Sequence, residues 1–161
     1  MIVDGKVIGS GLIGQEFSRA EYFWGRRSAT AGWPYNSAIS SGSCLGPTNP
    51  SLTGGTGQDG ELVKGVIAER IEALVGDGSS QPVLVPTDLA TASGSGLDPD
   101  ITLPAALFQI PRVARHRGLE ETALRDLVDQ LKQERFLGVL GEPRVNVLKL
   151  NVALDELSRR E

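Results

Sequence analysis

The stretch from Tyr22 to Pro50 is dense in glycine, serine, asparagine and proline, and it limits the folds open to this chain. These residues favour turns and disfavour the interior of helices and strands. A loop of this length inside a compact domain is typical of functional or disordered segments. Because Trp24, Trp33 and Tyr35 occur within it, we expect an ordered segment that lies against the rest of the domain. No regular alternation of strands and helices is predicted.

Helical periodicity follows this stretch. Asp59 can cap a helix whose apolar residues recur every three or four positions up to Gly76. A second helix is predicted from Pro104, in its first turn, to Gly118. Pro111 lies inside that helix, and we expect it to kink or interrupt the helix.

Two more helical segments are predicted near the C-terminus. Glu120 and Glu121 stand in the first turn of a third helix, where negative charge is favoured. Its buried face is predicted to carry Leu124, Leu127, Val128 and Leu131. Pro143 is expected to open a last amphipathic helix that runs through Leu157.

The β structure is predicted to be short. Ile2-Val3 and Lys6-Val7-Ile8 flank Asp4-Gly5, which is a strong hairpin signal. We expect further short strands over residues 83–85 and 89–92, and a flexible surface tip over residues 53–57. The prediction is a single α+β domain over residues 1–161, with a small β-sheet that includes the N-terminal hairpin packed against about four helices.

Charge and residue counts exclude several kinds of function. Sixteen Lys and Arg against twenty Asp and Glu give a net charge of −4 without a basic stripe, so nucleic acid is not expected as a partner. No run of 18 apolar residues occurs that could span a bilayer. Cys44 is the single cysteine and His116 the single histidine, which excludes an internal disulfide and a Cys/His zinc site. His116 precedes Arg117-Gly118 at a predicted helix end, where it fits a cation near the helix C-terminus, and we expect no catalytic residue and no metal.

Residues 9–14 spell G-x-G-x-x-G after Lys6-Val7-Ile8, which is the pattern of a dinucleotide-binding turn. A dinucleotide-dependent oxidoreductase that uses Gly9 to Gly14 is therefore one alternative function. The context opposes it, because the preceding strand is short and no acidic residue ends a strand about twenty residues later.

The segment from Thr91 to Pro99 is rich in small residues, whose backbone amides can approach an anion or a partner closely. It lacks the Lys-Ser/Thr end of a phosphate-binding loop, and Ser93 is not in a G-x-S-x-G elbow. A tight connection between a strand and a helix is the simpler interpretation.

Several motifs together resemble one protein family along nearly the whole chain. They include Gly9-Ser10, Leu12-Ile13-Gly14-Gln15, the stretches 22–31, 46–50, 91–99 and 109–118, and Leu140-Gly141-Glu142-Pro143-Arg144-Val145-Asn146-Val147-Leu148. In this order they resemble the C subunit of the bacterial Kdp potassium-transporting ATPase. The chain departs from the family pattern at several positions, among them Cys44 in place of a usual Asn and Asp100 in place of a usual His. No role of that His can be carried over.

The resemblance implies an accessory subunit rather than an enzyme. Such a subunit assembles with a channel-like A subunit and a P-type ATPase B subunit, as an assembly factor or as a catalytic chaperone that assists ATP binding by the B subunit. The chain lacks a phosphate-loop lysine and the Asp-Lys-Thr-Gly motif of P-type pumps, so we expect no ATP hydrolysis by the domain alone.

The resemblance also implies a place in the cell membrane. Family members carry a transmembrane helix ahead of this domain, and we expect that helix, absent from these 161 residues, to be the only contact with the membrane. The domain is then soluble by itself and is expected on the outer face. A secreted binding module that uses Trp24, Trp33 and Tyr35 is a third alternative.

Candidate site residues fall into two groups. No tightly bound cofactor is expected, but weak ATP binding is implied, with Gln15 and Arg26 as the candidate contacts. Gln15 has an alternative structural role, in which it fixes the end of the N-terminal β segment. The second group lies in three polar loops that we expect to meet. We expect Arg144 to bind Asp98 or Glu142 there. The residues of this group are Thr48, Asn49, Ser93, Gly94, Ser95, Gly96, Asp98, Glu142 and Arg144.

Overall fold

The computed structural model of the chain describes residues 1–3, 5–76 and 84–159. Six helices and three short antiparallel sheets occur in this part, which confirms the α+β class. Their bounds are β1 Ile2–Val3, β2 Lys6–Val7, α1 Pro50–Thr53, β3 Gly55–Thr56, β4 Leu62–Val63, α2 Val66–Val75, α3 Thr87–Ala90, β5 Asp100–Thr102, α4 Leu103–Arg117, α5 Glu121–Leu131, β6 Arg144–Asn146 and α6 Val147–Ser158.

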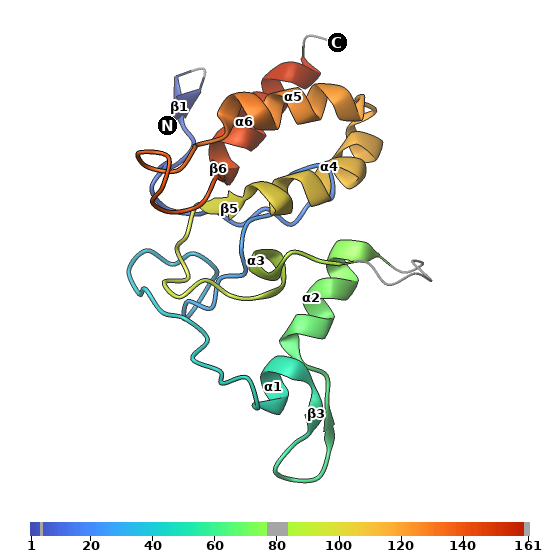
Figure 1. The fold of residues 1–161 in the computed structure, drawn as a ribbon. Coiled ribbons are helices and arrows are strands. Elements are labelled where there is room, and N and C mark those ends of the chain that lie inside the picture. Colours follow the sequence, from blue (N-terminus) through green and yellow to red (C-terminus); the bar gives the residue numbers. More distant parts are fainter. Residues whose placement is uncertain (4, 77–83, 160–161) are drawn as a thin grey trace.

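The main core lies where α4, α5 and α6 pack around the β5–β6 pair (Figure 1). β5 and β6 are antiparallel, with Ile101 opposite Val145, and both side chains are buried. Ile110 of α4, Leu124 of α5 and Leu150 of α6 are also fully buried. The buried faces of these three helices therefore form the centre of the domain.

Cap signals place both ends of α4 as predicted. The Thr102 side chain accepts a hydrogen bond from the Ala105 backbone N–H at the start. Gly118 ends the helix in the left-handed conformation, with a φ of 69°. Pro111 lies on the exposed side, and the helix runs through it without interruption. His116 is exposed in the last turn, as expected for a cation near a helix C-terminus.

Two predicted helices start later than expected, and the reason is strand pairing. α2 begins at Val66 instead of near Asp59, because Leu62–Val63 pairs with Gly55–Thr56 in a hairpin. α6 begins at Val147 instead of Pro143, because residues 144–146 pair with β5 and the Asn146 side chain caps the helix. α5 starts at Glu121, as predicted.

The other strand predictions are only partly confirmed. Thr87–Ala90 is a short helix, so the strand expected over residues 89–92 is wrong. Of the strand expected over residues 83–85, Val83 lies outside the described residues, and the other two are irregular. The N-terminal hairpin is present, with Ile2 opposite Val7, but it forms a separate sheet and exposes both side chains.

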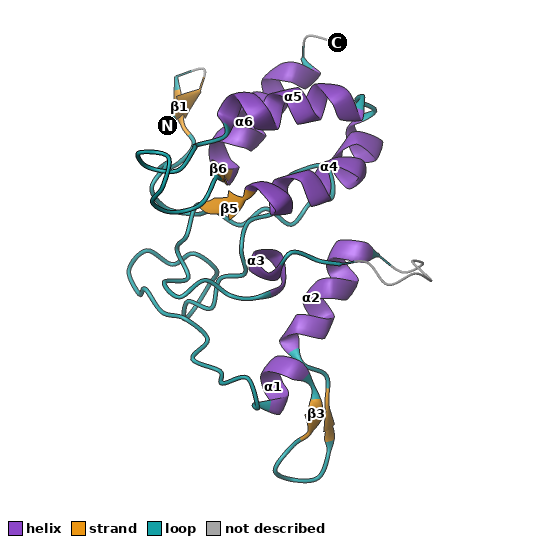
Figure 2. Cartoon of the chain, in the orientation of Figure 1, coloured by secondary structure: helices purple, strands orange, loops and turns teal. Residues whose placement is uncertain are grey.

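The long segment after Tyr22 is irregular, as Figure 2 shows by its teal trace, but it packs closely. Phe23 and Trp24 are buried in the main core. Trp33 is exposed. The ordered segment predicted from its aromatic residues is thus confirmed. Within the described residues, no helix is both long enough and apolar enough to cross a bilayer.

Candidate functional site

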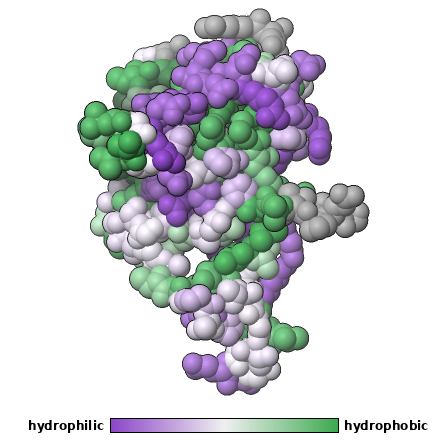
Figure 3. Space-filling view, viewed as in Figure 1, coloured by the Kyte–Doolittle hydropathy of each residue, from purple (hydrophilic) through white to green (hydrophobic). Residues whose placement is uncertain are grey.

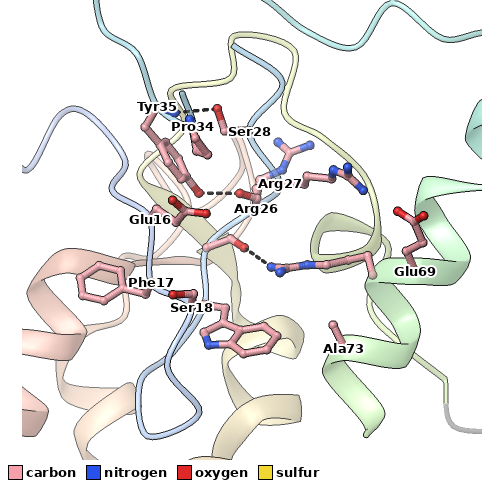
Figure 4. Close-up of a pocket in the computed structure, with 13 residues that line it drawn as sticks. Glu16, Phe17, Ser18, Arg26, Arg27, Ser28, Pro34, Tyr35, Glu69 and Ala73 are labelled. Atoms are coloured by element: carbon pink, nitrogen blue, oxygen red, sulfur yellow. Dashed lines mark hydrogen bonds between the residues drawn. The ribbon is translucent and has the colours of Figure 1, made fainter. Parts of the chain in front are cut away.

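A pocket of about 440 Å³ opens where the irregular N-terminal segment meets α2 (Figure 4). Its volume lies within the range of small-molecule sites. The N-terminal segment contributes most of the wall and α2 the rest; the lining residues are Glu16, Phe17, Ser18, Trp24, Gly25, Arg26, Arg27, Ser28, Pro34, Tyr35, Glu69, Arg70 and Ala73.

Three arginines lie in this wall, and two of them hold it together. Arg70 donates to the carbonyl oxygens of Leu89 (3.1 Å) and Gly25 (2.9 Å). Arg27 donates to the Val66 carbonyl at 3.1 Å. α2 is therefore tied to the N-terminal segment by guanidinium groups bonded to neutral oxygens.

Two guanidinium groups also lie over the ring of Trp24. The Arg112 carbon Cζ is 4.4 Å from the ring centroid and that of Arg70 is 5.0 Å. Burial and the nearby charge of Arg70 lower the pKa of Arg112 to about 10. Burial likewise lowers the pKa of Arg70. Of these two arginines, Arg70 lines the pocket, where it lies beside Glu69 of the same helix.

Tyr35 closes the other side of the pocket. Its hydroxyl donates to the Arg26 carbonyl, and its backbone N–H donates to the Ser28 hydroxyl at 2.8 Å (Figure 4). Burial raises the pKa of Tyr35 to about 12, so the phenol is neutral at physiological pH and acts as a donor.

The glycines of the pattern at residues 9–14 leave room for neighbouring protein groups, among them Tyr35. A Cβ at Gly14 would lie 2.3 Å from the Tyr35 ring and 2.7 Å from the Asp98 carbonyl oxygen. Gly9 has a φ of 148° and leaves room for the Gln15 amide. The dinucleotide alternative is not supported, because these glycines make room for protein groups and the strand pairs among the described residues are antiparallel.

The structure places Gln15 and Arg26 differently with respect to the pocket. The Gln15 amide donates to the Ile8 carbonyl at 2.9 Å, which is the structural role considered for it, and Gln15 does not line the pocket. Arg26 lines it and also forms an ion pair with Asp98, at 2.9 Å between Nη1 and Oδ2. Its buried Nε lacks a hydrogen-bond partner among the described residues.

Two of the three polar loops that were expected to meet do so. Asp98 and the 142–144 segment line one shallow pocket beside Arg26. Arg144, however, pairs with Asp100, at 2.9 Å, and not with Asp98 or Glu142. The expected pairing is therefore wrong, because β6 aligns Arg144 near the β5 strand.

The third loop lies elsewhere. The Asn49 side chain caps α1 by accepting from the Ser51 N–H, and Thr48 precedes it on the surface. α1 stands at the far end of the molecule from β6 in Figure 1. The expectation that residues 48–50 join the other two loops is wrong.

The glycine-rich segment 93–96 packs against the long irregular segment instead. The Ser41 N–H donates to the Ser95 carbonyl at 3.0 Å, and the Ser28 hydroxyl donates to the Gly96 carbonyl at 2.7 Å. Gly96 has a φ of 68°, and Gly94 approaches Gly42 backbone to backbone. Ser93 is buried, and its hydroxyl has no partner among the described residues.

Two buried side-chain amides, which the sequence analysis did not identify, fix the backbone of Phe23 and of the pocket-lining Trp24. Asn151 of α6 accepts from the Phe23 N–H and donates to the Phe23 carbonyl, both at 2.9 Å. Gln109 of α4 does the same for Trp24, at 2.7 and 3.0 Å. A polar residue on the apolar face of a predicted helix was the signal that could have revealed them. Within the described residues, no three His, Cys, Asp or Glu side chains are grouped to hold a metal ion.

Comparison with known proteins gives consistent matches over almost the whole chain. A family model described as "KdpC: K+-transporting ATPase, c chain" matches residues 1–156. The potassium-transporting ATPase KdpC subunit of Paraburkholderia xenovorans (strain LB400) is 53% identical over 156 residues, which cover 97% of this chain and 76% of the relative. The KdpC subunit of Herpetosiphon aurantiacus is 52% identical over 153 residues, covering 95% and 74%. That of Rhodopseudomonas palustris (strain BisB5) is 50% identical over 171 residues, covering 99% and 79%.

These relatives are all subunits of a potassium-transporting ATPase. The class of protein to which the chain belongs is therefore that of the subunits of cation-transporting ATPases. The chain belongs to the KdpC family, the c chain of the K+-transporting ATPase. It is accordingly an accessory subunit and not the catalytic chain, as the resemblance in its sequence implied.

Proposed function

We propose that this chain acts by binding the channel-like A subunit and the ATPase B subunit of an ATP-driven potassium uptake complex, as a factor for their assembly. The observation that carries the proposal is the family match over residues 1–156 together with about 50% identity to named KdpC subunits. Accessory subunits act through contact surfaces, and a rigid domain fixed by buried amides and arginines is suited to present one.

Co-purification tests this function. The chain is produced with the N-terminal helix implied by the family resemblance, tagged, and co-expressed with both other subunits. We expect the A and B subunits to co-purify with it in fixed ratio, and a tagged unrelated membrane protein to retain neither. Retention of neither subunit by the tagged chain would contradict the proposal.

A second candidate is the chaperone role, in which the chain binds ATP weakly and assists its use by the B subunit. The observation that favours it is the arginine-lined pocket of about 440 Å³ beside Trp24. Guanidinium groups suit phosphate, and an indole ring suits a base. Glu16 and Glu69 also line this pocket, and their charges oppose a triphosphate, so we expect weak affinity.

Calorimetry with ATP tests the nucleotide candidate. We expect Arg26→Ala to weaken binding about tenfold, since it removes a charged donor from the pocket wall. Gln15→Ala should leave the affinity within about twofold, because the Gln15 amide is bonded to Ile8. Arg125→Ala, on the exposed face of α5, is the matched control. We separately propose the outer membrane face for this domain, as part of the assembly function. Because ATP is an intracellular metabolite, this location and the nucleotide candidate exclude each other, and ATP binding that responds to Arg26→Ala would argue against the outer face.

A further inference from the structure

The pocket between the N-terminal segment and α2 carries charged groups of both signs that are not paired with one another. Glu16 and Glu69 line it, and within the part of the chain that the structure describes neither forms an ion pair. Arg27 and Arg70 also line it, and their guanidinium groups donate to backbone carbonyl oxygens instead of carboxylates. These four charged groups are therefore available to a ligand.

The two kinds of charge lie at different depths. Glu16 and Glu69 are exposed, whereas Arg27 and Arg70 are half-buried. Figure 4 shows the two glutamates on opposite sides of the pocket, one on the N-terminal segment and the other on α2, with Arg27 between them in this view. Burial lowers the pKa of Arg70, and the charge of Glu16 acts in the opposite direction, as expected for a carboxylate near that guanidinium. The carboxylates therefore stand at the mouth of the pocket and the guanidinium groups deeper in its wall.

Apolar side chains complete the lining of the pocket. They belong to Phe17 and Pro34 of the N-terminal segment and to Ala73 of α2. In the space-filling view of Figure 3, apolar residues continue over the surface where Figure 1 places α2. An aliphatic chain that joins two charged groups of a ligand is favourably buried against such a wall.

The charges of the pocket select the kind of ligand. Its remaining arginine, Arg26, is already paired with Asp98, so the other two arginines and the two glutamates leave no net charge. An anion alone pairs with the guanidinium groups but meets the carboxylates at the mouth, and a cation alone meets the opposite conflict. A molecule that carries both a carboxylate and an ammonium group pairs with both sets.

We propose that this pocket binds a small zwitterion in which an aliphatic chain joins a carboxylate to an ammonium group, as in an ω-amino acid. The ligand carboxylate binds Arg27 and Arg70, and its ammonium group lies at the mouth between Glu16 and Glu69. The inference does not depend on the proposed assembly function. It offers a different ligand from the nucleotide candidate for the same pocket, and it gives a role to the two carboxylates that oppose a triphosphate.

Calorimetry of the purified chain with three probes of similar length tests the need for both charges. The zwitterion ε-aminocaproate carries both charges, caproate carries only the negative one, and hexylamine carries only the positive one. We expect ε-aminocaproate to bind at least about tenfold more tightly than either of the other two. A probe of single charge that binds within tenfold of it would overturn the proposal, and so would an absence of binding by ε-aminocaproate.

Isosteric variants test the role of the two carboxylates. Glu16→Gln and Glu69→Gln each remove a charge from an exposed side chain and keep its size, so the fold is preserved. We expect each to weaken ε-aminocaproate binding about threefold and the double variant about tenfold, as for ion pairs at exposed sites. Caproate should bind the double variant at least as tightly as the wild type, since a repulsion is removed.

Glu72→Gln is the matched control, because Glu72 is an exposed residue of the same helix that does not line the pocket. It should keep the wild-type affinity within about twofold. Unchanged binding of ε-aminocaproate by the double variant would overturn the proposal. A loss of caproate binding equal to that of ε-aminocaproate would overturn it as well, because it would show a change in the pocket instead of a lost ion pair. Neither result bears on the co-purification that tests the assembly function.

Discussion

Asn151→Leu is expected to lower the free energy of unfolding by about 3 kcal/mol. The substitution leaves the N–H and the carbonyl of Phe23 without partners, and Phe23 is fully buried. Each buried backbone group that loses its partner costs about 1–3 kcal/mol. Urea denaturation followed by circular dichroism measures the change.

The control for this substitution is Gln130→Leu, which places the same side chain on the exposed face of α5. We expect it to change the stability by less than about 0.5 kcal/mol. An Asn151→Leu protein as stable as this control would mean that the Phe23 backbone does not depend on the amide.

The second large effect is expected from Gly14→Ala. The new methyl group would lie 2.3 Å from the Tyr35 ring and 2.7 Å from a backbone oxygen, so one of them must move. Overpacking of a buried position costs about 1–3 kcal/mol, and we expect about 2 kcal/mol here because a backbone atom is involved. Thermal unfolding of the purified variant measures it.

Gly11→Ala is the matched control from the same glycine pattern. A Cβ at Gly11 meets only the Lys149 side chain, at an ordinary distance of 3.6 Å. We expect this variant to keep the wild-type stability within about 0.5 kcal/mol. The opposite order of effects, with Gly11 the sensitive position, would revive a phosphate-binding role for the pattern.

Local signals predicted the helices well where those signals were complete. α4 and α5 have charged end residues and apolar residues at helical spacing, and α4 has a cap at both ends, so their bounds follow from the sequence. The starts of α2 and α6 depend on strand pairs instead. β5 pairs with β6 across more than forty residues, and no local pattern specifies such a partner.

Only part of the candidate site was predicted, again because a contact between residues distant in sequence leaves no local pattern. Arg26 was identified as a candidate from its position in the chain and does line the pocket. The role of Arg70 was not foreseen, because a charged residue on a surface-like helix carries no sign that it will reach a carbonyl forty-five residues away. Gln109 and Asn151 were more accessible to prediction, since each interrupts an apolar helical face.

The hydrogen bonds between the side-chain amides of Asn151 and Gln109 and the backbone of Phe23 and Trp24 also determine when the chain can fold during its synthesis. Asn151 is 128 residues from Phe23, and Gln109 is 85 residues from Trp24. Contacts so distant in sequence form slowly, and the N-terminal segment leaves the ribosome first. The Trp24 backbone therefore lacks its Gln109 partner until α4 has been translated, and the Phe23 backbone lacks its Asn151 partner until α6 has been translated. A chain that stalls before residue 147 leaves the N–H and the carbonyl of Phe23 without their native partner.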